Sequence, residues 1–269
     1  MSLPQSHAGH GESLLEVYAR LLAAYGPQGW WPGSGDPFEI VVGAVLTQSV
    51  AWANVERALT NLRAAGVLSA AGMHALPDAA LAALVRPSGY YTVKARRLRA
   101  VVRMVMEEFG GDLRSLLALP LPLLRGRLLG TYGIGQETAD DIVVYAAGQP
   151  SFIVDAYTVR LFTRLGLGPP APAAGVRPTA LSVVRTLPVA QEVAPPVSAP
   201  VLDDRRYALW QGYFTALLPA DAALFNEYHA LIVRHGVARC RKHHPRCADC
   251  PLLSLCPTGQ ALSAPNIDH

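Results

Sequence analysis

Residues 128–160 contain two helical patterns of apolar residues, joined by the tight turn Gly133-Ile134-Gly135. Leucines recur at helical spacing before the turn, and apolar residues recur in the same way at positions 139, 142, 143 and 146 after it. Glycine takes a positive φ at little steric cost and leaves the main chain open to another molecule. The first amides of the second helix point outward, where the helix dipole favours an anion. The pattern therefore predicts a helix-hairpin-helix that binds a phosphodiester.

Asp155 follows an apolar run and precedes another helical pattern that begins near Tyr157. An aspartate in this place is a common helix N-cap. Because it also lies just downstream of a predicted phosphate-binding hairpin, the same carboxylate is a candidate catalytic group. The residues alone leave both interpretations open.

The composition favours an all-α protein, because alanine and leucine dominate and runs of β-branched residues are short. No apolar run reaches the roughly 18 residues that cross a bilayer, and the first residues lack the form of a secretion signal. We therefore expect a cytoplasmic protein. Helical spacing predicts helices over residues 14–25, 38–46, 53–65, 78–85, 94–109, 113–119, 121–129, 207–218 and 222–236.

The remaining segments have little helical pattern. Asp36 and Pro37 are typical of the cap and first position of a helix. Residues 168–202 are rich in proline and alanine, which indicates an insert or flexible loop. We expect residues 1–12 and 258–269 to be loose tails.

Basic residues gather in two segments that contain no acid, residues 86–103 and 234–246, although the net charge of the chain is only +3. Each segment can be an ordinary solvated helix face. Together with the hairpin, they favour a surface that follows a nucleic-acid backbone.

All four cysteines lie between residues 240 and 256, spaced C-x6-C-x2-C-x5-C. In a cytoplasmic chain such clustering argues for metal binding rather than disulfides. The spacing leaves zinc and an iron–sulfur cluster both open. The candidate ligands are Cys240, Cys247, Cys250 and Cys256.

Three tryptophans lie close in sequence to one predicted helix, Trp30 and Trp31 before it and Trp52 after it. Trp30 and Trp31 stand in a Gly/Pro loop, where they can plug a domain interface or line a pocket for a flat base. Trp52 can stack on such a base or belong to the core.

The motifs LLxxYGIGxETAD and VDAYTxR, followed by the cysteine set, closely resemble the helix-hairpin-helix (HhH-GPD) DNA glycosylase superfamily, the endonuclease III relatives. The chain is most similar to the endonuclease III-related branch, which includes monofunctional 3-methyladenine DNA glycosylases. The resemblance covers about residues 28–257 apart from the insert. It implies two helical lobes: a barrel with the hairpin (38–150), and a cluster domain (13–37 with 151–257), with a DNA groove between them.

The resemblance also assigns roles to residues of this chain. It implies that Asp155 is catalytic and that the cysteines hold a structural [4Fe–4S] cluster. Gln48 would fill the gap left by an extruded base, although it can also be a helix-capping amide. Trp30, Trp31 and Trp52 would line the base pocket. The implied contacts to the DNA backbone are Gly133, Ile134, Gly135, Arg241 and Lys242.

Bifunctional relatives carry a lysine two residues after the second hairpin glycine, where this chain has Glu137. A carboxylate cannot form the Schiff base on which strand cleavage depends. We therefore expect a monomeric, monofunctional base excision repair glycosylase that acts on double-stranded DNA and associates with the nucleoid when bound to it. Glu137 can also be a helix cap.

The identity of the damaged base is less constrained. Alkylated purines such as 3-methyladenine suit a pocket of tryptophans through cation–π contact. Oxidised pyrimidines, as for endonuclease III itself, are the alternative substrate. A DNA-binding homologue without turnover, or a zinc-stabilised binding module, would share most of the same motifs.

Overall fold

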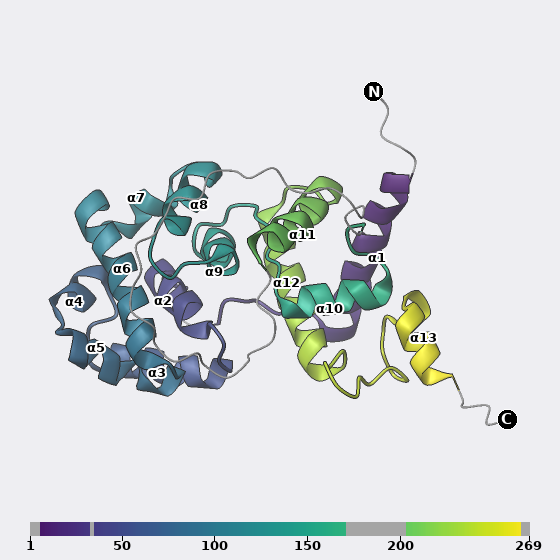
Figure 1. Cartoon of the computed structure of the whole chain (residues 1–269), viewed down its shortest axis with the longest axis horizontal. Helices are drawn as coiled ribbons and strands as arrows, with labels where there is room; N and C mark the ends of the chain where they lie inside the picture. The colour runs from purple at the N-terminus through teal and green to yellow at the C-terminus, as the bar shows by residue number, and fades with distance from the viewer. Residues whose placement is uncertain (1–5, 33–34, 171–202, 265–269) are drawn as a thin grey trace.

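The structure is a computed structural model that describes residues 6–32, 35–170 and 203–264. Every regular element in these ranges is helical, which confirms the predicted all-α fold class. Figure 1 shows two groups of helices side by side along the long axis, one formed by α2 to α9 and the other by α1 and α10 to α13. No helix of the described residues is both long enough and apolar enough to span a membrane.

The first lobe surrounds α2, which is buried over the whole span 38–46. The Asp36 carboxylate caps this helix by accepting from the Phe38 amide at 2.8 Å, which confirms the predicted helix start. The helices of the first lobe are α2 (Pro37–Thr47), α3 (Trp52–Ala64), α4 (Ala70–Ala75), α5 (Asp78–Leu84), η1 (Arg86–Ser88), α6 (Tyr91–Phe109), α7 (Leu113–Leu117), α8 (Leu121–Leu129), α9 (Gln136–Asp141) and the π-helical turn η2 (Ile142–Ala146).

The second lobe joins the start of the chain to its later part. Aromatic side chains fill its core, with Phe152 stacked on Phe214 at a centroid distance of 4.2 Å. The Tyr228 hydroxyl donates to the carbonyl of Leu14 at 2.6 Å, so the later helices hold the first one in place. Its helices are α1 (Ser6–Tyr25), α10 (Ala156–Leu165), α11 (Asp204–Leu217), α12 (Ala222–Ala238), η3 (Leu253–Leu255) and α13 (Pro257–Ser263).

The lobes meet through a small apolar cluster and a buried polar group. Ile40, Val144, Tyr145 and Ile153 form a separate buried cluster. Beside it, Asp140 has no solvent exposure. Its carboxylate accepts hydrogen bonds from both lobes and from the segment between them. The donors are Arg125 Nε (2.8 Å) and Nη2 (3.0 Å), Ser151 Oγ (2.6 Å), Tyr207 Oη (2.8 Å) and Gln211 Nε2 (2.7 Å).

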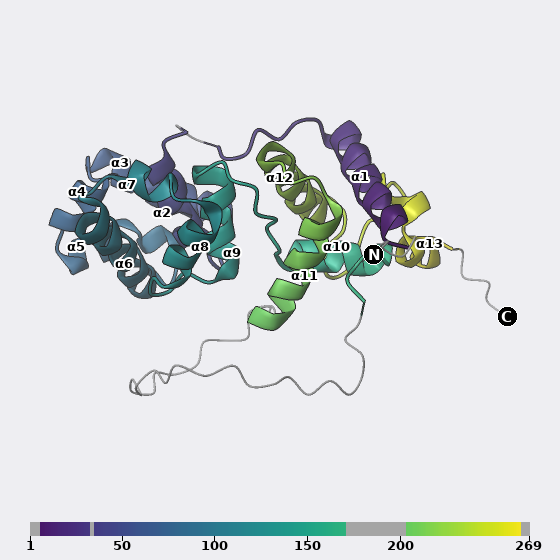
Figure 2. The ribbon, with the colours of Figure 1, turned by 90° about the horizontal axis from the view of Figure 1, so that it is seen from above.

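Helix α12 lies between the first lobe and α1 (Figure 2) and contacts both η2 and α1. It can therefore carry side chains to the junction of the lobes. His229, one such residue, is 9% exposed and lies against Tyr145 of η2.

The ends of the described chain differ from the prediction of loose tails. Helix α1 begins at Ser6 and packs closely on α11, because a Cβ at Gly11 would lie 2.9 Å from the Leu217 carbonyl oxygen. Helix α13 forms because the Cys256 sulfur caps it, accepting from the Gly259 amide at 3.2 Å. The predicted tails are therefore wrong for residues 6–12 and 258–263. Most of the predicted insert, residues 171–202, lies outside the described residues.

Candidate active site and cysteine loop

The two glycines of the hairpin are required for different structural reasons. Gly133 has a φ of +81°, and a Cβ there would lie 2.3 Å from Cγ of Arg97. Gly135 has an ordinary φ of −88°, and a Cβ there would meet nothing within 4 Å. Gly133 is therefore required by the fold, whereas Gly135 leaves an open face at the start of α9.

Ile134 does not suit the predicted contact with DNA. Its side chain is only 6% exposed, and its amide donates to the Thr131 carbonyl at 3.1 Å. Neither group is free to reach a phosphate. The amides of Gly133 and Gly135 have no hydrogen-bond partner within the described ranges, so they remain the predicted contacts of this turn.

Gln48 ties the end of α2 to the hairpin. Its side-chain nitrogen donates to the Gly133 carbonyl at 3.2 Å and to the Thr138 hydroxyl at 2.9 Å. Its side-chain oxygen accepts from Arg97. The amide thus supports the hairpin from inside, and filling the gap left by a base remains a prediction.

The three tryptophans form one aromatic cluster with pairwise centroid distances of 5.0 to 5.6 Å. Trp31 packs over Gly43 of α2, where a Cβ would lie 2.4 Å from its ring, and its indole nitrogen is buried without a partner in the described chain. Trp31 therefore packs against α2, next to the apolar cluster at which the lobes meet. Its ring also lies 5.4 Å from that of Tyr145, which links the cluster of Trp30, Trp31 and Trp52 to the surroundings of Asp155.

Asp155 is the N-cap of α10, as one of its two interpretations predicts. Its Oδ1 accepts from the amide and the hydroxyl of Thr158 at 2.7 and 2.8 Å. Its Oδ2 lies 3.7 Å from Nε2 of His229, a separation longer than a hydrogen bond. The side chain is 10% exposed. One carboxylate oxygen is thus occupied by the cap, and the other is not.

The pKa of Asp155 is lowered, because the interactions with His229 and Thr158 outweigh the raising effect of burial. The opposite holds on the neighbouring α9. Burial, with Asp155 as a second cause, raises the pKa of Glu137 to about 8. Burial, Glu137 and Asp155 raise the pKa of Asp141 well above its usual range.

Glu137 is nevertheless exposed at the surface, so water screens its carboxyl group in the free protein. Glu137 lies in the first turn of α9, after the N-cap Gly135, where the helix dipole favours a carboxylate.

The two basic segments are used differently. In the first, Lys94 is 1% exposed and its ammonium donates to the carbonyls of Leu46 and Ser88 at 2.8 and 2.6 Å. Arg99 likewise donates to the Leu76 carbonyl at 2.6 Å. Lys94 and Arg99 are therefore bound inside the fold, whereas Arg86, Arg96 and Arg103 are exposed. For these three arginines, contact with a nucleic-acid backbone stays a prediction.

In the second segment, Arg241 and Lys242 are exposed. Arg164 of α10 donates to their carbonyls at 2.8 and 3.2 Å and so holds the loop that carries them. The predicted backbone contacts of this loop are therefore free to meet a polyanion.

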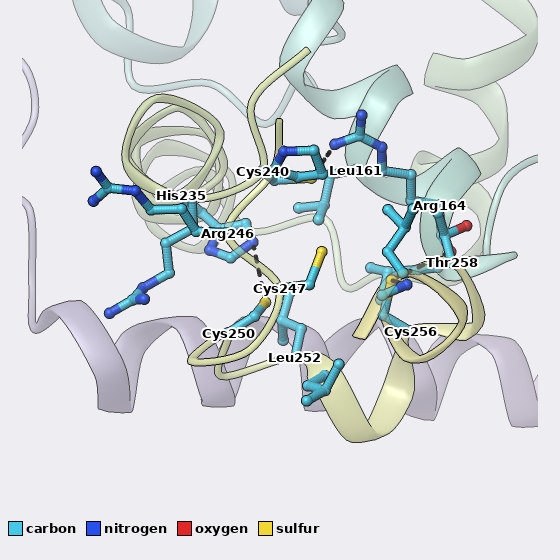
Figure 3. Close-up of a pocket in the computed structure, with 16 residues that line it drawn as sticks. Leu161, Arg164, His235, Cys240, Arg246, Cys247, Cys250, Leu252, Cys256 and Thr258 are labelled. Atoms are coloured by element: carbon cyan, nitrogen blue, oxygen red, sulfur yellow. Dashed lines mark hydrogen bonds between the residues drawn. The ribbon is translucent and has the colours of Figure 1, made fainter. Parts of the chain in front are cut away.

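The four cysteines surround one hollow with Leu161, Leu165 and Leu252. Figure 3 shows Cys247 and Cys250 pointing toward its middle, with Arg164 reaching Cys240 from α10. Two donors contact the sulfurs at 3.2 Å, Arg164 Nη1 to Cys240 and the Gly259 amide to Cys256. Within the described ranges, no three potential ligands stand close enough to hold a single metal ion.

This donor set fits a thiolate-bound group with a wide core. A [4Fe–4S] cluster takes four thiolates, is tuned by hydrogen bonds to its sulfurs and is sheltered by apolar side chains. The hollow supplies all three features. The ring of His235 adds a further contact, with Nε2 lying 3.8 Å from the Cys250 sulfur.

Comparison with known proteins identifies the family. The protein-family model described as "HhH-GPD superfamily base excision DNA repair protein" matches residues 42–185. A Methanocaldococcus jannaschii protein described as a DNA repair glycosylase is 35% identical over 246 residues, covering 91% of this chain and 96% of its own. Endonuclease III of Bacillus subtilis is 28% identical over 230 residues, covering 84% and 83%.

Two solved structures share the fold. Endonuclease III in a non-covalent complex with DNA matches with a TM-score of 0.68 at 20% identity, over 94% of this chain and 97% of that one. The H. pylori 3-methyladenine DNA glycosylase MagIII, bound to 1,N6-ethenoadenine, matches with a TM-score of 0.59 at 25% identity, over 83% and 95%.

The family model covers more than half of the chain, and the archaeal relative matches it almost end to end. Both agree with the hairpin motif and with the all-helical fold. The chain therefore belongs to the HhH-GPD superfamily of base excision DNA repair proteins, among its endonuclease III-like DNA glycosylases.

Proposed function

We propose that this chain is a monofunctional DNA N-glycosylase that removes a flipped-out alkylated purine, such as 3-methyladenine, and leaves the abasic site intact. The observation that carries the proposal is Glu137, which occupies the place of the lysine of bifunctional relatives and whose carboxyl group is influenced electrostatically by Asp155. A carboxyl group cannot form an imine with the sugar.

The lysines of the chain do not replace the missing amine. Lys94 is buried, with its ammonium bound to two carbonyls. Lys242 lies in the cysteine loop, among residues that contact α10. Neither contacts Asp155 in the described structure. This arrangement supports hydrolysis by water rather than attack by an amine.

Asp155 has the properties that the hydrolysis needs. The target nucleotide must leave the base stack before its glycosidic bond can be reached. Positive charge then develops on the sugar, and an ionised carboxylate stabilises that charge and orients a water. The lowered pKa keeps Asp155 ionised at neutral pH. Because Oδ1 is held by Thr158, we assign this chemistry to Oδ2.

The surroundings of Asp155 favour a cationic base. Asp155, whose lowered pKa keeps it ionised, supplies a negative charge there, and the aromatic cluster lies next to Tyr145. Negative charge and aromatic faces both attract a positively charged flat ring. Alkylated purines such as 3-methyladenine have this character. The similarity to MagIII, whose structure holds 1,N6-ethenoadenine, supports the same substrate class.

The test combines a lesion panel with borohydride trapping. Wild type should release 3-methyladenine from duplex DNA, leave the strand uncut and give no trapped adduct. Glu137→Lys is the matched gain-of-function control, because it restores the amine at the corresponding position. Adduct formation by wild type would show that the chain is bifunctional.

One alternative substrate has a specific observation in its favour, since endonuclease III of Bacillus subtilis covers 84% of this chain. The same panel should therefore include thymine glycol. Release of thymine glycol without 3-methyladenine would assign the chain to oxidised pyrimidines. Release of no base, with DNA binding retained, would favour a non-catalytic DNA-binding homologue.

The proposal also includes a [4Fe–4S] cluster held by Cys240, Cys247, Cys250 and Cys256, which line one hollow. The bound cluster would be structural, joining the loop with Arg241 and Lys242 to α13. Purified protein should be brown and contain about four irons and four acid-labile sulfides per chain. Zinc without sulfide would exclude the cluster.

A further inference from the structure

His229 of α12 is a buried histidine with one unpartnered nitrogen. The residue is 9% exposed, and its Nδ1 lies 2.7 Å from the Tyr145 hydroxyl. Its Nε2 is buried and has no hydrogen-bond partner in the described structure. A buried polar atom without a partner is destabilising, so a place where one persists is a candidate for function.

The unpartnered nitrogen faces the oxygen of Asp155 that the helix cap leaves open. Nε2 and Oδ2 are 3.7 Å apart, and the two side chains are 11% and 10% exposed. The opposite oxygen of Asp155 is held by Thr158. Three elements thus meet here through successive side-chain contacts: Tyr145 of η2 contacts His229 of α12, and His229 faces Asp155 at the start of α10.

The charges around the imidazole favour one tautomer. A proton on Nε2 faces a carboxylate, and Nδ1 is then free to accept the Tyr145 O–H. The other titratable groups that act on this junction, Glu137, Asp141 and Glu227, are acids as well. Helix α1 meets α12 one residue away, through Tyr18 against Tyr228.

We propose that His229 is a positioning residue for Asp155, with Tyr145 fixing its tautomer so that Nε2–H is directed at the open carboxylate oxygen. His229 thereby holds that oxygen ionised and oriented toward the nucleotide. This inference rests on the proposed glycosylase function. The arrangement is similar to that of other catalytic sites, in which a second group orients the reacting one.

The experiment compares His229→Leu, His229→Gln and Tyr145→Phe in single-turnover base release from pH 4 to 9. His229 stabilises the charged form of Asp155, so its loss raises the pKa of that carboxyl. In His229→Leu the acidic limb should therefore move to higher pH by about one unit, with rates about tenfold lower at pH values below the limb. His229→Gln should recover most of the shift, because its amide can donate to Oδ2. Tyr145→Phe should give a smaller shift.

A second readout does not depend on activity. Carboxyl ¹³C NMR of the free proteins follows the titration of Asp155, with Asp155→Asn identifying the signal. The signal should titrate at higher pH in His229→Leu than in wild type and His229→Gln. If His229→Leu fails to fold, His229→Gln and Tyr145→Phe are compared by the same two measurements.

Two results would overturn the proposal. One is a rate that falls equally at all pH values with an unmoved acidic limb, as a purely structural role predicts. The other is an Asp155 titration that is the same in His229→Leu as in wild type. If wild type releases no base from any lesion, the proposed function fails instead, and the NMR titration still decides the role of His229.

Discussion

Asp140 and Asp155 are both buried aspartates near the junction of the lobes, but their carboxylates have different surroundings. Asp140 is fully buried, and both of its oxygens accept hydrogen bonds from side chains of the two lobes. Asp155 uses one oxygen for its helix cap and leaves the other facing His229 at 3.7 Å. A carboxylate whose two oxygens both accept hydrogen bonds from the protein serves to hold the structure together. A carboxylate with one oxygen left open can also take part in a reaction.

The largest expected effect is that of Asp155→Asn on base release. Asparagine still caps a helix, but it removes the negative charge proposed to stabilise the transition state. The single-turnover rate should fall by about 100- to 1,000-fold or more, while the melting temperature changes little. Retained affinity for lesion-containing duplex is the control. A rate close to that of wild type would show that Asp155 is only a cap.

Asp140→Asn should show the reverse pattern. It leaves Arg125 without its ionic partner at the junction of the lobes, and breaking a buried ion pair costs about 3–5 kcal/mol. We expect the free energy of unfolding in urea to fall by about 3 kcal/mol. Base release per folded molecule should fall far less than in Asp155→Asn. Equal losses of activity in the two variants would remove the contrast between the two aspartates.

The two hairpin glycines show the same difference between a residue that supports the fold and one that is open to a ligand. Gly133→Ala places a Cβ against Arg97 at a φ of +81°, so we expect a loss of about 1–2 kcal/mol in stability. Gly135→Ala should leave stability nearly unchanged but weaken DNA binding, because its Cβ would enter open space. Urea unfolding and fluorescence anisotropy with duplex DNA measure the two effects. Unimpaired DNA binding by Gly135→Ala would show that the open face is not used.

The smallest expected effect concerns Glu137, whose pKa is raised to about 8 by burial and by Asp155. Because the folded state holds the proton more tightly than the unfolded state, this group lowers stability as pH rises from about 4.5 to 8. Glu137→Gln should remove that pH dependence. The exposed side chain limits the gain to several tenths of a kcal/mol at pH 8. Urea unfolding at pH 5 and pH 8 checks the sign, and a gain at pH 5 alone would contradict it.

Local patterns predict most of the helices. The helix predicted over residues 121–129 has the observed bounds of α8, and the cap by Asp36 is seen as expected. Short elements such as α4 (Ala70–Ala75) were not predicted. Six residues contain too few turns to show an apolar period, and such a helix forms because its neighbours bury it.

The pattern of charge in the sequence was a weaker guide. Lys94 and Arg99 belong to a segment whose charge pattern predicts a basic surface, yet both donate to main-chain carbonyls inside the first lobe. Nothing local distinguishes them from Arg241, which is exposed. The difference arises because helix ends from distant parts of the chain present carbonyls to the first pair only.

The sequence by itself determined the family, the all-helical class, the glycine turn and the four thiols, because these depend on residue types at short, fixed spacings. The tertiary structure decided which polar groups are used up inside the fold. Asp140, Gln48 and Lys94 find partners that lie far away in the sequence. His229 approaches Asp155 only because α12 packs between η2 and α1. Burial and hydrogen bonding between distant segments are properties of packing, and no local pattern encodes them.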